Sequence, residues 1–202
     1  MALLLSVLEQ GMIYGILALG VYITYKILDF PDLTVDGSFP FGAAITVRLI
    51  NGFGVPAILT LPIAFLGGAL VGICTGLIHV KLKVRDLLSG IIMMTGLYTI
   101  NLWVAGSGYV AIFDKDNIFN NNFVNSITPD FLVNFKNVII IFLITMVAKY
   151  LLDWYMSTKS GFLLRAVGDN DTIVTSLGVD KGLVKIVGLS IANGLVSLSG
   201  CI

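Results

Sequence analysis

The chain has 202 residues, of which 57% are hydrophobic and 12% are charged, and its formal net charge is zero. Soluble domains carry about 25% charged residues, so this composition indicates an integral membrane protein. It argues against a soluble catalytic domain and against nucleic-acid binding, because there is no soluble basic face. The sequence also contains no phosphate-binding GxxxxGK[ST] loop, no Ser/His/Asp or HExxH arrangement and no paired cysteines, so we expect no catalytic residue, metal site or cofactor in this chain.

Five or six apolar segments follow one another along the chain. A membrane-spanning helix needs about 20 apolar residues, and the predicted spans are 3–28, 33–50, 55–80, 87–106, 136–152 and 183–202. We therefore predict an all-α fold, a polytopic transmembrane helical bundle forming one domain over residues 1–202. Because the chain stops inside an apolar run, we expect this domain to be incomplete at its C-terminus.

The second segment is short and contains Gly37, Pro40 and Gly42, so we predict a broken second span. Proline and glycine in a span leave backbone groups that neighbouring protein or a wet cavity must satisfy. Broken helices are where transporters tend to place solute sites.

Polar side chains in this segment are candidates for a substrate path, since an ionised group in lipid costs a few kcal/mol or more. They are Asp32, Thr34, Asp36 and Ser38. The alternative is that Asp32 only caps the span and that Asp36 pairs with Lys26 or Lys83. We expect Asp36 to lie deeper, with fewer routes to water, so that Asp36→Asn impairs transport more than Asp32→Asn.

Two features stand out in the next spans. Gly68, Gly72 and Gly76 repeat every four residues, a small-residue stripe that lets another helix approach closely, most simply one of the same chain. Asn101 places an amide in the fourth span. It either holds the bundle together or lines a translocation path.

A polar, glycine-punctuated loop covers residues 157–185, between the last two spans. Oxygens of Asp169, Asn170 and Asp171 can cap a short helix over 172–177, and Gly178 can end it in the left-handed conformation. The apolar residues of this helix fall on one side, which nothing in the chain obviously covers. The helix therefore suits docking to a partner, although packing on its own spans or lying in lipid headgroups fits the pattern as well.

The distribution of Lys and Arg predicts the orientation. Strict alternation of the spans places nine basic residues on one side, which are Lys26, Lys81, Lys83, Arg85, Lys149, Lys159, Arg165, Lys181 and Lys185. Only Arg48, Lys115 and Lys136 lie on the other side. We therefore predict that the loop 157–185 is cytoplasmic and that the N-terminus is outside.

Two motifs resemble a known family. The segment DLTVDGSFPFGAA, residues 32–44, and the segment GFLLRAVGDN, residues 161–170, followed by Leu177-Gly178-Val179, are similar to bacterial ABC-transporter permeases of the branched-chain amino acid and ribose importer class. The DLTVDGSF wording resembles the subgroup that works with lipoprotein-type binding proteins and is linked to amino acid uptake. The resemblance covers essentially the whole chain.

The resemblance implies a permease in the bacterial plasma membrane whose cytoplasmic loop carries a coupling helix. The residues that match the coupling segment are Gly161, Arg165, Ala166, Gly168, Asp169, Asn170, Leu177 and Gly178. The implied partners are an ABC ATPase subunit that binds ATP and Mg²⁺, a second permease copy, either identical or paired, an extracytoplasmic solute-binding protein and the lipid bilayer. Two other hypotheses remain: an ion-gradient-driven secondary transporter that uses Asp32, Asp36 or Glu9, and a scaffold or channel that pumps nothing.

Overall fold

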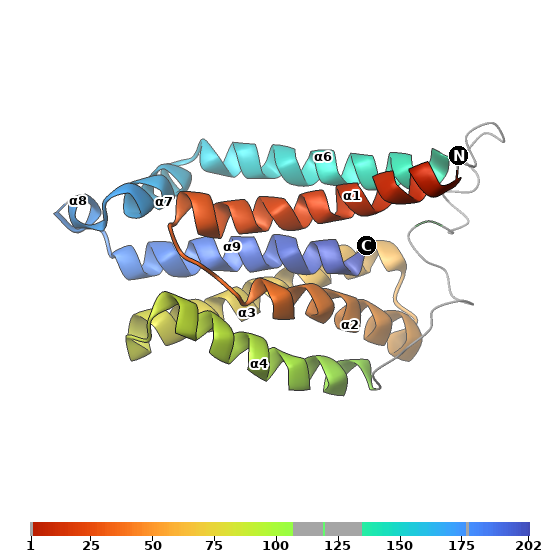
Figure 1. Ribbon diagram of the computed structural model, residues 1–202, viewed down its shortest axis with the longest axis horizontal. Helices are drawn as coiled ribbons and strands as arrows, with labels where there is room; N and C mark the ends of the chain where they lie inside the picture. Colours follow the sequence, from red (N-terminus) through yellow and green to blue (C-terminus); the bar gives the residue numbers. More distant parts are fainter. Residues whose placement is uncertain (1, 107–118, 120–134, 177) are drawn as a thin grey trace.

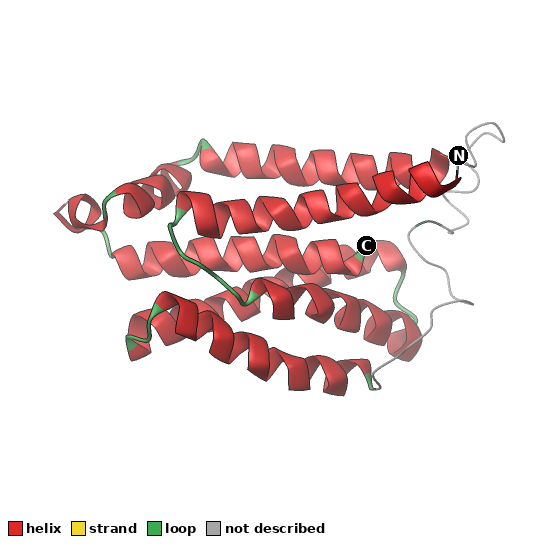
Figure 2. Cartoon of the chain, viewed as in Figure 1, coloured by secondary structure: helices red, strands yellow, loops and turns green. Residues whose placement is uncertain are grey.

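The computed structural model describes residues 2–106, 119, 135–176 and 178–202. Within these ranges the chain is helical, without strands, and the long helices lie side by side in one bundle (Figures 1 and 2). The predicted all-α polytopic bundle is confirmed. Most of the polar stretch 108–135 falls outside the described residues.

The helices begin and end close to the predicted span limits. They are α1 (Ala2–Val21), continued by the π-helix η1 (Tyr22–Ile27), α2 (Val35–Phe53), α3 (Ala57–Leu82), α4 (Asp86–Ala105), α6 (Lys136–Met156), α7 (Lys159–Asp169), α8 (Asp171–Ser176) and α9 (Lys181–Cys201). Five of the described helical stretches are long and apolar enough to cross a membrane: Leu3–Ile27, α3, α4, α6 and α9.

Helix α9 forms the centre of the bundle. Of its most apolar 18-residue window, 61% is buried inside the protein, compared with 17% for α4 and for α6. It packs against α1, α2 and α3, and Figure 1 shows it running through the middle of the bundle. The last span is therefore the one least exposed to lipid.

The glycine stripe of α3 packs closely against α9. A Cβ atom added at Gly76 would lie 2.8 Å from the Ile186 side chain, and Cβ atoms at Gly68 and Gly72 would overlap the backbone of α9. The predicted close packing of this stripe within the chain is confirmed. Side chains larger than hydrogen would separate α3 from α9.

The interruption in the second segment lies before α2 rather than inside it. Helix α2 runs without a break through Gly37, Pro40 and Gly42. The non-helical part is residues 28–34, called the linker below, where Asp29 has a positive φ of 50°. Figure 1 shows the linker as a coil segment that joins the end of η1 to the start of α2. Pro40 stands in the second turn of α2, where its missing N–H removes the helical hydrogen bond to the Asp36 carbonyl oxygen.

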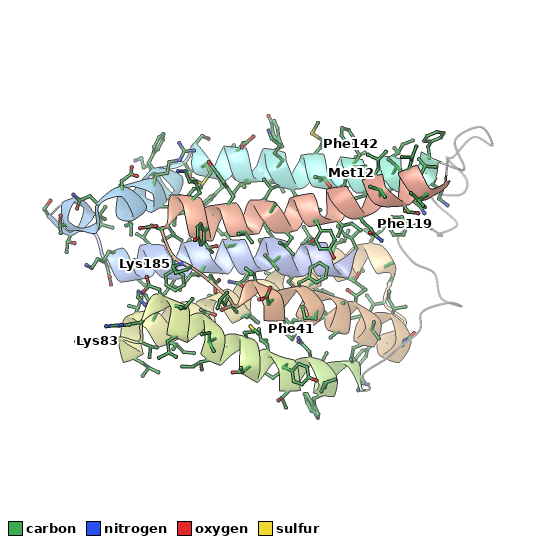
Figure 3. The ribbon with its side chains drawn as sticks, in the orientation of Figure 1. Met12, Phe41, Lys83, Phe119, Phe142 and Lys185 are labelled. Carbon is green, nitrogen blue, oxygen red and sulfur yellow. The ribbon has the colours of Figure 1, made fainter. Side chains whose placement is uncertain are left out.

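One end of the bundle carries most of the positive charge. The ends of η1, α3 and α6 and the starts of α4 and α9 meet there, beside α7 and α8, and Figure 3 places Lys83 and Lys185 at that end. The nine basic residues that were predicted to share a side belong to these helix ends and to α7. Their common side is confirmed, whereas the side of the membrane that this end faces stays a prediction.

Candidate functional site

A buried cluster of polar side chains joins the linker and α2 to α9. Asn193 Nδ2 donates to Asp32 Oδ2 at 2.8 Å, and Ser38 Oγ donates to Asn193 Oδ1 at 2.6 Å. The Thr34 backbone N–H donates to Asp32 Oδ1 at 2.8 Å. Asp32 is 7% exposed, and Ser38 and Asn193 are fully buried. Buried polar groups are costly unless they are paired, and each of these finds a partner within the cluster.

A second contact fastens the linker to α3. The Thr34 and Thr75 hydroxyl oxygens are 3.1 Å apart, and Thr75 Oγ1 also donates to Val71 O at 3.1 Å. On the other side, a Cβ atom at Gly90 of α4 would lie 2.8 Å from Leu33 N, so α4 covers the linker closely. The linker does not belong to a helix. Hydrogen bonds from side chains of α3 and α9 and the close packing of α4 hold the linker in place instead.

The two carboxylates of this region have opposite environments. Asp32 is buried in the cluster, whereas Asp36 is exposed on the outer side of α2. The expectation that Asp36 is the more enclosed of the two carboxylates is therefore wrong, whereas the larger effect of Asp36→Asn on transport stays a prediction. The expectation assumed that a residue farther into the segment is farther from the surface, but the outer face of α2 is not covered by another described helix. No ion pair joins Asp36 to Lys26 or Lys83 in the described part of the chain.

Asn101 links α4 to the start of α2. Its Nδ2 donates to the carbonyl oxygen of Gly37 at 3.1 Å, which is the bundle-holding role that the sequence left open. Its Oδ1 is shielded from solvent and has no hydrogen-bond partner among the described residues. The structure thus joins Asp32, Thr34 and Ser38 in one cluster, and it places Asp36 and Asn101 outside that cluster.

The segment after α6 is a pair of short helices rather than a loop with one helix. The predicted short helix is confirmed as α8, and Asn170 Oδ1 accepts from the Thr172 N–H at 3.1 Å at its start. Helix α7 was not predicted. Its N-cap is Thr158, whose hydroxyl oxygen accepts from the Gly161 N–H at 3.4 Å. Gly178 has the predicted left-handed conformation, with φ of 77°.

Helix α7 has an inner and an outer face. Gly161, Leu164 and Val167 are buried, whereas Phe162, Arg165 and Asp169 are exposed, and Ala166 and Gly168 lie at the boundary. Asn170 and Gly178 are exposed as well, and Leu177 lies outside the described residues. The predicted coupling residues therefore divide into a packing set and a surface set.

The expectation that nothing covers the apolar side of the short helix is wrong for Val174. This side chain is fully buried and belongs to the main hydrophobic core, together with Leu164 and Val167 of α7. Helix α8 packs on α7 and on the start of α9, which accounts for the cover. Val174 is therefore not available for docking to a partner.

Close contacts connect α7 to the linker. A Cβ atom at Gly168 would overlap the carbonyl oxygen of Ile27, the last residue of η1. Gly188 of α9 packs against the Leu28 and Leu164 side chains, so the first residue of the linker is held between α7 and α9. A displacement of α7 would therefore reach the linker, Asp32 and α9 without an intervening flexible element.

The turn between α3 and α4 is fastened by His79. Its Nδ1 lies 2.9 Å from the Val84 carbonyl oxygen and 3.1 Å from Asp86 Oδ1, at the start of α4. Its ring also meets the Phe30 ring of the linker edge-on, with centroids 5.1 Å apart. This side chain therefore has a structural role at the basic end of the bundle.

A groove of about 800 Å³ lies between α3, α6 and α9. Its lining is almost entirely apolar, with Phe65, Leu66, Leu151 and Leu195 among its walls. Polar solutes need convergent hydrogen-bonding groups in their sites. This groove therefore suits hydrocarbon rather than a polar solute.

Sequence reasoning missed Asn193 and Thr75. Both are polar residues inside long apolar runs, the same signal that singled out Asn101. Their partners, Asp32 and Thr34, lie 161 and 41 positions earlier in the chain. The composition of each span could have marked them as candidates, but not shown which residues they meet.

A family model described as "Branched-chain amino acid transport system / permease component" matches residues 3–202. The tyrosine transport system permease protein of Clostridioides difficile is 42% identical over 198 residues, which are 98% of this chain and 62% of that protein. The probable branched-chain amino acid transport permease protein LivH of Methanocaldococcus jannaschii is 26% identical, covering 96% of this chain and 64% of its own. The ribose import permease protein RbsC of Haemophilus influenzae is 24% identical, and the alignment covers 98% of this chain and 59% of that protein.

The chain therefore spans about 60% of the length of these three relatives, while the relatives align with nearly all of it. No solved structure matches the chain significantly.

Proposed function

The chain belongs to the family of branched-chain amino acid transport system permease components, and from this premise we propose that it is the transmembrane permease subunit of an ATP-driven (ABC) importer. Such a subunit carries a solute across the membrane and catalyses no covalent step. Its contribution is to offer different contacts in two conformations, so that a path opens alternately to each side.

The segment 157–182 is the proposed contact with a separate ATPase subunit that binds ATP and Mg²⁺. The observation that carries this role is the two-faced geometry of α7. Leu164, Val167 and Gly168 anchor it to the bundle, while Arg165 and Asp169 stand exposed at the basic end. The inner face of α7 is closely packed against the bundle. A partner that displaces the exposed face would therefore displace the residues packed against the inner face as well.

The movement would pass from α7 to the spans through the linker. Gly168 touches Ile27, the linker follows directly, and Asp32 is bonded to Asn193 in the central helix. Packed cores switch between discrete arrangements rather than deform continuously. A shift of α7 would therefore reposition the start of α2 and the middle of α9 together.

The solute we propose is an amino acid or related compound. The relative of highest identity given above is named for tyrosine transport, and the segment DLTVDGSF resembles the amino acid subgroup that uses lipoprotein-type binding proteins. The further proposed partners are that extracytoplasmic binding protein and a second permease copy, either identical or paired. The protein would be a multi-pass component of the bacterial plasma membrane with its N-terminus outside.

The test is co-purification and uptake with the neighbouring ATPase and binding protein. Arg165→Glu reverses a charge on the exposed face of α7, and we expect it to abolish ATPase association and ATP-dependent uptake. The matched control is Arg48→Glu, the same change on an exposed residue at the opposite end of the bundle, which we expect to leave both unchanged.

Two outcomes would reject the proposal. If Arg165→Glu leaves ATPase association and uptake intact, the coupling role of this segment is wrong. If uptake survives ATP depletion and follows an ion gradient, the secondary transporter is the correct class. The exposed carboxylate of Asp36 is the observation that favours this second class, because it could carry an ion or a proton.

A further inference from the structure

Asp36 is an exposed carboxylate halfway across the membrane. Its neighbour Gly37 packs against Met94 and Leu97, the ninth and twelfth of the 20 residues of α4. Ser38 bonds to Asn193, the thirteenth of the 21 residues of α9. Helices of this length span about 30 Å, the thickness of the hydrocarbon core. Both neighbouring contacts therefore place Asp36 near the middle of the bilayer.

Lipid is a poor environment for this side chain. A charge at the centre of a bilayer costs at least about 3 kcal/mol, so intramembrane carboxylates face a partner or a water-filled cavity. The described part of the chain offers Asp36 no ion-pair partner, and the basic residues of the bundle are gathered near its ends. The outer face of α2 therefore requires a polar surrounding that the described residues do not provide.

The backbone beside Asp36 is also rich in acceptors. Pro40 stands one turn farther along α2 and has no N–H, so the Asp36 carbonyl oxygen lacks its usual helical donor. On the inner side, the Asn101 amide donates to the Gly37 carbonyl oxygen and holds this turn of α2 against α4. The Asp36 carboxylate and the Asp36 carbonyl oxygen thus place acceptors on the same residue of α2, which favours a cationic hydrogen-bond donor at this point.

We propose that the outer face of α2 at Asp36 and Pro40 lines a water-filled translocation path, and that Asp36 binds the ammonium group of an amino acid solute. This assignment rests on the proposed function, and it separates two roles within the second segment. Asp32, Thr34 and Ser38 hold the linker in place inside the bundle, and Asp36 meets the solute. Charge complementarity supports the choice, because the ammonium group is the cationic part of a zwitterionic amino acid.

The first experiment measures water access. In a background with Cys74 and Cys201 replaced by serine, a cysteine at position 36 is treated with a charged methanethiosulfonate reagent in membranes that contain the assembled transporter. The control is a cysteine at Leu70, which is 64% exposed and lies midway along α3. We expect position 36 to react at least about 10-fold faster than position 70, because a charged reagent does not enter hydrocarbon. Equal or slower labelling at position 36 would overturn the proposal, whether lipid or another span covers it.

The second experiment measures solute binding through uptake of L-tyrosine. Loss of a charge-assisted hydrogen bond should raise the KM of Asp36→Asn by about 10-fold or more, whereas Asp36→Glu should retain most of the uptake. The control is Asp153→Asn, an exposed carboxylate at the end of α6, with expected uptake close to wild type. The ordinary structural role of Asp36 would be to stabilise the N-terminus of α2. Asp36→Asn would then lower the thermal midpoint and leave the KM unchanged, which would refute the ammonium assignment.

The two proposals fail in different ways. Absence of ATP-dependent uptake in the wild-type complex contradicts the proposed function, and the labelling at position 36 still decides whether this face meets water. Wild-type uptake that is driven by ATP, together with an unchanged KM in Asp36→Asn, contradicts only the assignment of Asp36.

Discussion

Asn193 donates a 2.8 Å hydrogen bond to Asp32, although 161 positions of the chain separate the two residues. The same amide accepts from Ser38, so one side chain of the central helix holds both the linker and the first turns of α2. Because the linker is not part of a helix, these side-chain bonds help to set its path through the bundle. They also connect the region near α7 to the middle of α9.

Asp32→Asn should destabilise the protein. Asp32 accepts two hydrogen bonds, from Thr34 N and from Asn193 Nδ2, and an asparagine offers only one oxygen, so one buried donor must face an NH₂ group. We expect a loss of about 1–3 kcal/mol, seen as a lower thermal midpoint of the purified protein in detergent. Asp36→Asn is the matched control, because its side chain is exposed and makes no such bonds.

Exchanging the two side chains should restore part of the lost stability. In Asp32→Asn with Asn193→Asp, the new amide can donate to the new carboxylate and still accept from Thr34 N, while Ser38 keeps an acceptor. The bond from Asn193 Nδ2 to the Leu189 carbonyl oxygen is lost, so the rescue should be partial. The double variant should therefore melt closer to wild type than either single variant. If the destabilisations simply add, the Asp32 and Asn193 side chains do not interact in the folded protein.

Gly72→Ala should disrupt the contact between α3 and α9. Its Cβ atom would overlap the backbone of Leu189 and Ser190, and the two helices would have to separate. Overpacking of this kind costs about 1–3 kcal/mol, so we expect reduced yield and a lower thermal midpoint. The control is Gly96→Ala on α4, where no atom lies within 4 Å and alanine should be neutral or slightly stabilising.

Gly168→Ala should uncouple ATP hydrolysis from transport. The added methyl group would push α7 away from the Ile27 carbonyl while leaving the exposed face around Arg165 intact. We therefore expect the ATPase to remain bound and active, with fewer solute molecules imported for each ATP. Gly15→Ala, at an open position of α1, is the control. An unchanged ratio of solute to ATP would mean that this contact does not transmit movement.

Val174→Asp should release α8 from the bundle. Val174 is fully buried in the main core, and an unpaired charge there cannot be solvated. Hydrogen exchange of the amides in 171–176 should become faster than in wild type. Thr172→Asp, at an exposed position of the same helix, should leave the exchange nearly unchanged. Similar exchange in both variants would show that the core contact does not hold α8.

The sequence by itself determined five long apolar spans, the shared end of the basic residues and the small-residue contact, whereas α2, the predicted second span, is not among the stretches that are long and apolar enough to cross a membrane. Apolar length limits where a chain can cross 30 Å of hydrocarbon, and alternation then assigns the loops to two sides. Residues such as Gly72 carry their own signal because few other residues permit backbones to touch. These properties depend on local composition, so one sequence is enough to predict them.

Only the tertiary structure decided which polar residues are buried and which partners they meet. Asp32 and Asp36 are four positions apart, as if on one helix face, but Asp32 belongs to the non-helical linker and points into the bundle, while Asp36 is exposed on α2. Likewise, the cover of Val174 and the bond from Asn193 to Asp32 depend on which helices lie side by side. Burial is a property of the assembled bundle, and the spacing of residues along one segment does not contain it.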